Sequence, residues 1–338
     1  MKKYLILILA VFIVLGGCTE KTKNVSDEVY KNKEVNKDVE KPIQKDKNDQ
    51  DEKKLSEEDE EKIMMHYNEI LANKKPYEVL AFIDKNIYVL SEKNADELLI
   101  GLEKVQNKYK SEYTDSLLED DFIKQNKLHK IFGYKFNKRK IEAIEDEDLK
   151  ALVVEMVKGG YKLVTLEGSF YPIIDYGYLK KYMPYVSDEM KGFINIVSRE
   201  SNHLTWNGDK VSISWDELSN RALKAEEYLK KYKESQMRKE VANLYMMYIN
   251  TLMNGSQNMP LLDVKTNKVN NKILNSYQKL LTENATTTTA KIIKEYIEAI
   301  EKNEAKIDDT IIEVSDKLRQ KVIEDLNLGK GLTDYTAQ

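Results

Sequence analysis

Two carboxylates in the middle of the chain, Glu167 and Asp175, are the residues whose types and spacing could do chemistry. A pair of carboxyl groups can act as acid and base, or as acid and nucleophile, in glycoside hydrolysis. Glu200, near His203, could supply the same acidic group. The opposing interpretation is that Glu167 and Asp175 cap neighbouring helices. A cell-wall polymer hydrolase is therefore one of two functional hypotheses.

Aromatic side chains gather in the same central region, where the helical pattern is interrupted. Tyr171, Tyr176, Tyr178, Trp206 and Trp215 could line a pocket or groove, because loops on a rigid scaffold often carry binding residues. They could equally pack one helical layer on another. The sequence predicts a binding surface here but leaves open which aromatic residues face a ligand.

The signatures of familiar catalytic and metal sites are missing from the sequence. There is no G-x-S-x-G, Walker A or H-E-x-x-H motif, and the one cysteine lies at the N-terminal end. His66, His129 and His203 are far apart in the sequence, so zinc-ligand spacing is absent. We therefore expect no metal and no cofactor, and an enzyme is the less favoured hypothesis.

The beginning of the chain has the layout of a secretory signal. Lysines precede an apolar run from Tyr4 to Leu15, which would form about 18 Å of helix. A bilayer core is about 30 Å thick, so this run is too short for a stable transmembrane helix. Gly16, Gly17 and Cys18 follow directly, where an ordinary signal peptide has an A-x-A-like site.

The segment Leu15-Gly16-Gly17-Cys18 resembles the lipobox of bacterial lipoproteins. The resemblance implies diacylglyceryl transfer to the Cys18 thiol, cleavage after Gly17, and a mature chain anchored in the cell membrane by palmitate-type chains, facing the extracytoplasmic side. Each buried acyl CH₂ contributes about 0.8 kcal/mol, so two or three chains make a lasting anchor. The alternative is a buried cysteine in an ordinary hydrophobic leader.

Composition limits the other classes of partner and fold. The chain has 54 basic and 58 acidic residues, and we see no basic excess or patch of the kind that nucleic-acid binding needs. We therefore expect no nucleic-acid partner. Only 13 glycines and 5 prolines argue against a turn-rich β-sandwich, and 41% hydrophobic residues are enough for a sizeable core.

The sequence divides into five parts. They are a lipoprotein signal peptide at 1–17, a lipidated cysteine and disordered charged tether at 18–55, an N-terminal helical region at 56–158, an aromatic-rich centre with C-terminal helical hairpins at 159–329, and a loose tail at 330–338. The tether has too few apolar residues to offset the entropy of ordering, and a fraying helix is the alternative.

Capping residues and apolar periodicity predict a mostly α fold. Ser56 should begin the first helix, Pro76 the second and Asn94 the third, with further helices over 114–130 and 146–158. In the second half, further helices should start after the next two capping serines and end at glycine. These residues are Ser187, Ser214 and Gly255.

A short two-stranded β element is the most sheet that we expect. Residues 161–166 are β-rich and residues 210–214 alternate, so each could form a strand, and the two could pair. In the C-terminal half, a shift of 48 residues superimposes two amphipathic helix pairs. It aligns Tyr245 with Ile293 and Tyr248 with Tyr296. This predicts stacked, tetratricopeptide-like helical hairpins, with chance similarity as the alternative.

A second resemblance covers residues 150–305 approximately. The stretch Glu167-Gly-Ser-Phe-Tyr-Pro-Ile-Ile-Asp-Tyr176, and Ser214 to Leu218 after it, are similar to segments of lipoproteins and other secreted proteins of spore-forming Firmicutes. The resemblance implies a recurring extracytoplasmic module with no activity attached. The leading hypothesis is thus a lipid-anchored helical protein that acts as an interaction or binding module for an envelope protein, a peptide or a wall glycan.

Overall fold

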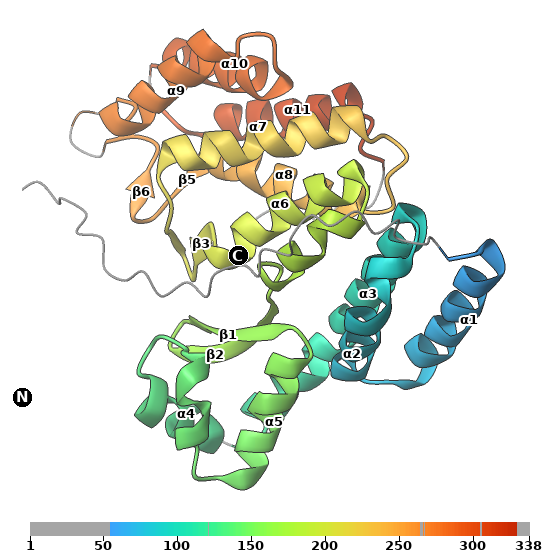
Figure 1. The fold of residues 1–338 in the computed structure, drawn as a ribbon. Helices are drawn as coiled ribbons and strands as arrows, with labels where there is room; N and C mark the ends of the chain where they lie inside the picture. Colours follow the sequence, from blue (N-terminus) through green and yellow to red (C-terminus); the bar gives the residue numbers. More distant parts are fainter. Residues whose placement is uncertain (1–54, 121, 264–265, 267, 305, 330–338) are drawn as a thin grey trace, which may run out of the picture. The chain divides into compact units, whose positions relative to one another are not determined.

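The computed structural model describes residues 55–120, 122–263, 266, 268–304 and 306–329. Over this part of the chain the fold is mostly helical with short two-stranded sheets, which confirms the predicted fold class (Figure 1). The predicted signal peptide, Cys18, nearly all of the tether and the tail at 330–338 lie outside the described residues.

The first half of the described chain consists of helices followed by a β-hairpin. Its elements are α1 (Glu57–Asn73), α2 (Pro76–Asn86), the 3-10 helix η1 (Ile87–Val89), α3 (Glu92–Leu118), α4 (Ile123–Phe132), the 3-10 helix η2 (Lys138–Ala143), α5 (Glu147–Lys158), β1 (Tyr161–Leu166) and β2 (Ser169–Ile174). Helix α3 contacts α1, α2, α4 and β2, and α5 packs against α2 and β1.

The second half is built from helices and two small hairpins. Its elements are η3 (Tyr178–Tyr185), α6 (Asp188–Asn202), β3 (Trp206–Asn207), β4 (Lys210–Val211), α7 (Trp215–Lys231), α8 (Arg238–Asn254), β5 (Gly255–Ser256), β6 (Met259–Pro260), α9 (Asn271–Glu283), α10 (Thr288–Lys302) and α11 (Asp309–Asp325). None of the helices in the described ranges is long and apolar enough to cross a membrane.

Most of the predicted helix ends are confirmed. The Ser56 hydroxyl accepts the first-turn N–H of Asp59 at 3.2 Å, and Pro76 is the first residue of α2. Ser187 and Ser214 cap α6 and α7 in the same way. Gly255 ends α8, with a φ of 70° that disfavours other residues.

Two predicted boundaries are wrong. Helix α3 begins after Ser91 rather than at Asn94, because the carboxylate of Glu60 on α1 accepts hydrogen bonds from both the Ser91 and Asn94 side chains. The predicted helix over 114–130 is two helices, broken at Phe122, where the chain takes a φ of 67°. The first boundary depends on a contact with another helix, and such a contact cannot be predicted from the local sequence.

The predicted strand at 161–166 forms, but its partner is residues 169–174 and not 210–214. The two strands are joined by a two-residue turn, Glu167 and Gly168, both with positive φ. Such a turn closes almost no loop, so the local hairpin has a lower entropy cost than the distant pairing. Residues 210–211 pair instead with β3, and β5–β6 form a third hairpin that we did not predict.

Two hydrophobic clusters hold the described residues together. The smaller one lies on both sides of position 158, where we expected the two helical regions to meet. It consists of Tyr113, Leu117, Leu128, Phe132, Ile141, Ile144, Leu149, Val153, Met156, Tyr161, Leu163, Phe170 and Ile174. The larger cluster includes α1, α2, the first half of α3, and the helices from α6 onward. Tyr109 and Tyr176 pack against both clusters and join them.

The C-terminal half contains packed helical hairpins. Helix α7 contacts α8 and α9, and α8 contacts α10 and α11. The 48-residue shift relates α7 to α9 and α8 to α10, which are pairs that lie against each other. The pair α7–α8 follows the hairpin β3–β4, and the pair α9–α10 follows the hairpin β5–β6. This packing fits the prediction of stacked hairpins (Figure 1).

Candidate binding groove

The predicted carboxylate pair is far apart. Glu167 is exposed in the turn between β1 and β2, whereas Asp175 follows the other end of β2 and forms an ion pair with Lys162 at 3.0 Å. Six-residue strands separate the two positions by roughly 20 Å. Acid and base in glycoside hydrolysis are about 5 to 10 Å apart. The expectation that Glu167 and Asp175 could act together is therefore wrong.

Three of the five predicted binding aromatics are part of the packing. Trp215, the first residue of α7, is only 4% exposed. Trp206 is half-buried and donates its indole N–H to the Thr251 hydroxyl at 3.0 Å. Tyr176 donates its hydroxyl to the buried Glu103 carboxylate at 2.5 Å. All three side chains are committed to contacts inside the fold.

The other two aromatics lie elsewhere on the surface. Tyr171 is half-buried in β2, where it pairs across the hairpin with Val164. Tyr178 in η3 is exposed, with the Lys181 ammonium 3.9 Å from its ring centre. The structure does not bring the five aromatics together, and none of them lines either of the two grooves described below.

The larger of these grooves lies between α6 and α7 and encloses about 620 Å³. Its lining is basic, amide-bearing and aromatic. The lining residues are Lys180, Gly192, Asn195, Ile196, Arg199, Asn202, His203, Arg221, Lys224, Glu227, Tyr228, Lys231, Tyr232 and Tyr248. We refer to this feature as the α6–α7 groove.

The aromatic wall of the α6–α7 groove depends on a glycine. Gly192 on α6 faces α7, and a Cβ atom there would lie 3.1 Å from Cδ2 of Tyr228. This close approach lets the Tyr228 ring pack against the α6 backbone. Tyr232, one turn further along, has its ring centre 4.9 Å from that of Tyr228. The two tyrosines thus form one continuous surface.

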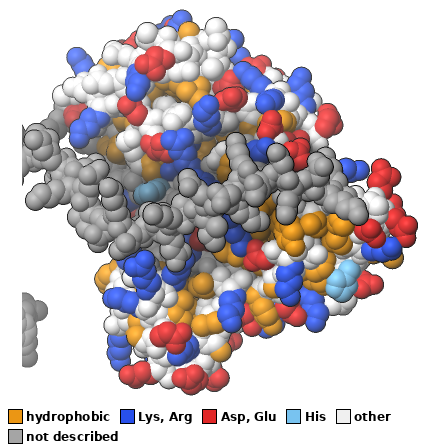
Figure 2. Space-filling view, viewed as in Figure 1, with side chains coloured by type: hydrophobic (Ala, Val, Ile, Leu, Met, Phe, Trp, Pro, Cys, Tyr) orange, Lys and Arg blue, Asp and Glu red, His pale blue; other side chains and the backbone are white. Residues whose placement is uncertain are grey.

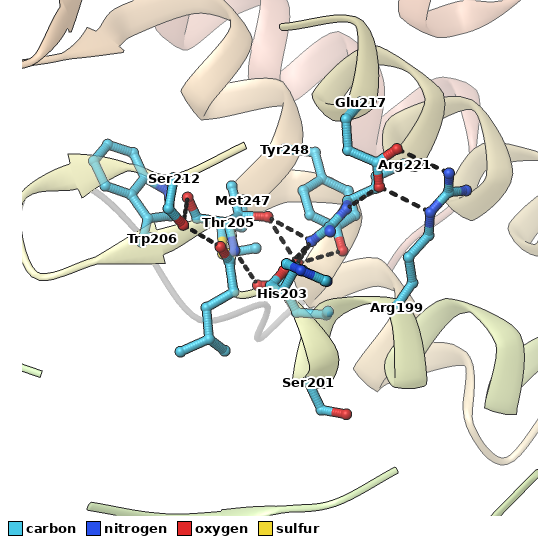
Figure 3. Close-up of polar contacts among 12 residues, drawn as sticks. Arg199, Ser201, His203, Thr205, Trp206, Ser212, Glu217, Arg221, Met247 and Tyr248 are labelled. Atoms are coloured by element: carbon cyan, nitrogen blue, oxygen red, sulfur yellow. Dashed lines mark hydrogen bonds and ion pairs between the residues drawn. The ribbon is translucent and has the colours of Figure 1, made fainter. Parts of the chain in front are cut away.

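A buried arginine fixes one end of the groove (Figure 3). Arg221 on α7 is 4% exposed, and its guanidinium donates to Glu217 at 2.8 Å and to Glu200 at 2.6 Å. It also donates to the backbone oxygen of His203 at 2.8 Å, the residue that ends α6. These bonds tie the end of α6 to α7, so the groove is held open by a rigid network.

The carboxylates in this network are fully engaged. Glu200 accepts from the N–H and hydroxyl of Thr205, both at 2.7 Å, and from the Tyr248 hydroxyl at 3.0 Å. Burial alone would lower the pKa of Arg221, but Glu217 and Glu200 outweigh it and raise that pKa. The guanidinium is therefore permanently charged. Glu200 supports Arg221, and its bonds leave it poorly placed as the catalytic acid that we considered.

The second arginine of the groove is more accessible. Arg199 on α6 forms a two-pronged ion pair with Glu217, with both N···O distances at 2.8 Å. Glu217 thus bridges Arg199 and Arg221, and its charge is shared between them (Figure 3). A ligand carboxylate or phosphate could compete for Arg199 without disturbing the buried Arg221, because planar guanidinium groups bind such anions in pairs of bonds.

Three lysines surround the opening. Lys224 is paired with Glu227 at 2.8 Å, whereas Lys180 and Lys231 form no ion pair with any described residue. The groove has five basic lining residues and one acidic lining residue, Glu227, with Glu200 and Glu217 beneath them. The formal charge of this set is therefore +2. The groove is therefore suited to an anionic ligand that also has apolar or aromatic surface.

A second groove, of about 480 Å³, lies between α7 and α9. It is polar, with Asp216, Glu217 and Glu283 against Lys279 as its charged residues. Its chemistry is therefore different from that of the α6–α7 groove. Across the described ranges, no group of three or more His, Cys, Asp or Glu side chains is placed to hold a metal ion.

Sequence reasoning picked out only Glu200 and His203 near this groove, and it gave Glu200 a catalytic role instead of a supporting one. The usable signal was Glu217 and Arg221, one helical turn apart, which predicts an ion pair on α7. Arg199 and Glu200 lie on another helix, and their meeting with α7 is a tertiary contact. Comparisons of the chain with protein-family models, curated proteins and solved structures found no match.

Proposed function

We propose that the protein is a membrane-anchored extracytoplasmic lipoprotein that binds an acidic, partly apolar segment of an envelope protein or peptide in the α6–α7 groove. The lipobox-like segment ending at Cys18 supports the location. The observation that carries the binding role is the basic rim around a tyrosine wall, with Arg221 fixing the groove from beneath. Binding proteins commonly use such preformed concave sites.

The charge of the groove favours a peptide over a neutral wall glycan. An anionic ligand could pair with Lys180 and Lys231, whereas a neutral sugar would gain no such ion pair. The amides of Asn195 and Asn202 can bond peptide groups, and Tyr232, which is half-buried beside the buried Tyr228, offers apolar area. The hydrolase hypothesis is not carried further, because Glu167 and Asp175 are too far apart to act on one bond.

The test uses the full chain and a defined probe, a soluble glutamate–tyrosine copolymer. We expect saturable binding that weakens at least about tenfold in the Lys180→Glu/Lys231→Glu variant, since two attractive contacts become repulsive. The matched control is Lys272→Glu/Lys291→Glu, which reverses two exposed charges away from the groove. No binding by the unaltered chain, or an equal loss in the control, would count against the proposal.

A further inference from the structure

A basic segment without any acidic residue runs from Phe122 to Ile141, through α4 and into η2. Its cations are Lys124, Lys127, Lys130, Lys135, Lys138, Arg139 and Lys140. The whole chain has a formal charge of −4, so the net charge does not reveal this local excess of basic residues. The expectation that the sequence contains no basic patch is therefore wrong.

Two of these cations are neutralised inside the fold. Lys124 pairs with Glu119 at 2.8 Å, and Lys127 pairs with Asp146 at 2.5 Å. The other five are exposed and form no ion pair with the described residues. We call these five the basic patch: Lys130, Lys135, Lys138, Arg139 and Lys140. Their unneutralised charge is available to an anionic partner.

Apolar side chains are exposed beside the basic patch. Ile123 is 53% exposed and Tyr134 is 77% exposed, the highest value among the large apolar residues of the described chain. Ile123 and Lys130, seven residues apart, lie on one face of α4, and Tyr134 is exposed in the turn after the helix, which ends at Gly133 with a φ of 62°.

The fold holds this face in a fixed orientation. Phe136 points inward, with its ring centre 5.0 Å from that of Phe132. The backbone oxygen of Tyr134 accepts from the Thr165 hydroxyl at 2.9 Å, and a ring nitrogen of His129 lies 2.7 Å from the Gly168 oxygen. The turn after α4 is thereby fastened to the β1–β2 hairpin, and the cations that follow it are exposed.

We propose that the basic patch, with Ile123 and Tyr134 beside it, docks onto an anionic phospholipid bilayer. Lysine and arginine are attracted to an anionic leaflet, while tyrosine and aliphatic side chains insert at the level of the headgroups. A soluble phosphate polymer would use the cations but give no role to the exposed apolar residues. The nearness of a bilayer rests on the proposed lipid anchor, whereas the docking is independent of the α6–α7 groove.

The charge around the patch also gives the docking a direction. Acidic residues follow it directly in the sequence, at Glu142, Glu145, Glu147 and Asp148. Figure 2 shows Lys and Arg side chains gathered on one edge of the part that holds α4, with acidic side chains next to them. An anionic bilayer would attract the first edge and repel the second. The docked protein should therefore have one preferred orientation.

The experiment measures co-sedimentation of the full chain, carrying Cys18→Ser, with two kinds of vesicle. One kind is phosphatidylcholine alone and the other contains about one third phosphatidylglycerol; the N-terminal apolar run contributes to both. We expect tighter binding to the anionic vesicles, at least about tenfold, and loss of most of this difference in Lys135→Gln/Lys138→Gln/Arg139→Gln/Lys140→Gln, because each cation near the surface contributes appreciably. Raising the salt concentration should have the same effect.

The matched control neutralises four exposed lysines elsewhere, in Lys93→Gln/Lys239→Gln/Lys272→Gln/Lys291→Gln. Retention of the anionic preference in this control, with a smaller loss in Tyr134→Ser, supports docking through the patch. An equal loss in the control would overturn it, because only net charge would then matter. Unchanged vesicle binding in the patch variant, with lost binding to soluble poly(glycerol phosphate), would also overturn it and identify a polymer as the partner.

Discussion

At the scale of single residues, the hydrogen bond from Tyr176 to Glu103 gives a structural role to a residue that was predicted to bind a ligand. Glu103 on α3 is buried, and Tyr176 packs against both hydrophobic clusters. Burial raises the pKa of Glu103 to about 7, with a further contribution from Glu240, and the hydrogen bond from Tyr176 opposes this only in part. Tyr176 is thus a structural link and not a ligand contact.

The burial of Glu103 predicts a stability that falls as pH rises. The folded-state pKa of Glu103 lies above its ordinary value of 4.5, so the folded protein holds the proton more tightly than the unfolded chain. The favourable contribution is complete below pH 4.5 and is lost as pH passes through about 7. Relative to Glu103→Gln, whose amide stays neutral, the unaltered chain should lose about 3 kcal/mol across this window.

Urea unfolding of both chains at a series of pH values measures the effect. Glu112→Gln, an exposed position on the same helix, is the control and should show no such divergence from the unaltered chain. Parallel stability curves for Glu103→Gln and the unaltered chain between pH 4.5 and 8 would refute the argument.

At the scale of elements, α10 is attached to α7 by a single buried carboxylate. Glu226 on α7 is 2% exposed and accepts the backbone N–H groups of Thr288 and Thr289 at 2.7 and 2.8 Å, together with the Thr289 hydroxyl at 2.6 Å. Burial alone would raise the pKa of Glu226, but Lys230 and these hydrogen bonds outweigh it and lower that pKa. The first turn of α10 is therefore capped from another helix.

Removal of this cap should loosen α10 selectively. Glu226→Ala leaves two buried N–H groups and a hydroxyl without their acceptor, and we expect a loss of about 3 kcal/mol. Glu227→Ala removes the neighbouring exposed carboxylate and should change stability by less than about 0.5 kcal/mol. Hydrogen exchange of residues 288–302, measured beside urea unfolding, distinguishes the two. Similar losses in both variants would contradict the role given to Glu226.

Elements are also the scale at which the sequence was most informative. Ser56, Ser187 and Ser214 marked helix starts, because a capping side chain acts within its own first turn, and Pro76 did so because its fixed φ suits the first helical position. The pairing of β1 was not predictable in the same way, since both candidate partners have β-rich residues. Its two-residue turn decided the outcome.

The binding groove could not be predicted for a related reason. Arg199 and Arg221 lie on different helices, and only the packing of α6 on α7 brings both to Glu217. The conspicuous aromatics drew attention to the central region, but large apolar rings are more often buried than exposed. Trp215 followed this rule.

At the scale of the whole molecule, the account joins three features with separate evidence. The lipobox-like segment ending at Cys18 supports the proposed attachment to a membrane, the basic patch is the proposed contact with an anionic bilayer, and the α6–α7 groove is the proposed ligand site. The groove and the patch can fail independently, because they use different residues on different elements, whereas the nearness of a bilayer to the patch depends on the anchor. A protein bound to its membrane at both the lipid and the patch would present the groove in a restricted set of directions.

Site-specific photocrosslinking in cells tests the central claim most directly. A photoreactive amino acid replaces Asn195, inside the α6–α7 groove, or Lys291, exposed on α10, in the full chain. We expect one defined envelope-protein adduct from position 195 and none from 291, with the adduct lost in Lys180→Glu/Lys231→Glu. It should also weaken in Cys18→Ser, which releases the chain from the membrane fraction. No adduct at 195, or the same adducts at both positions, would contradict the account.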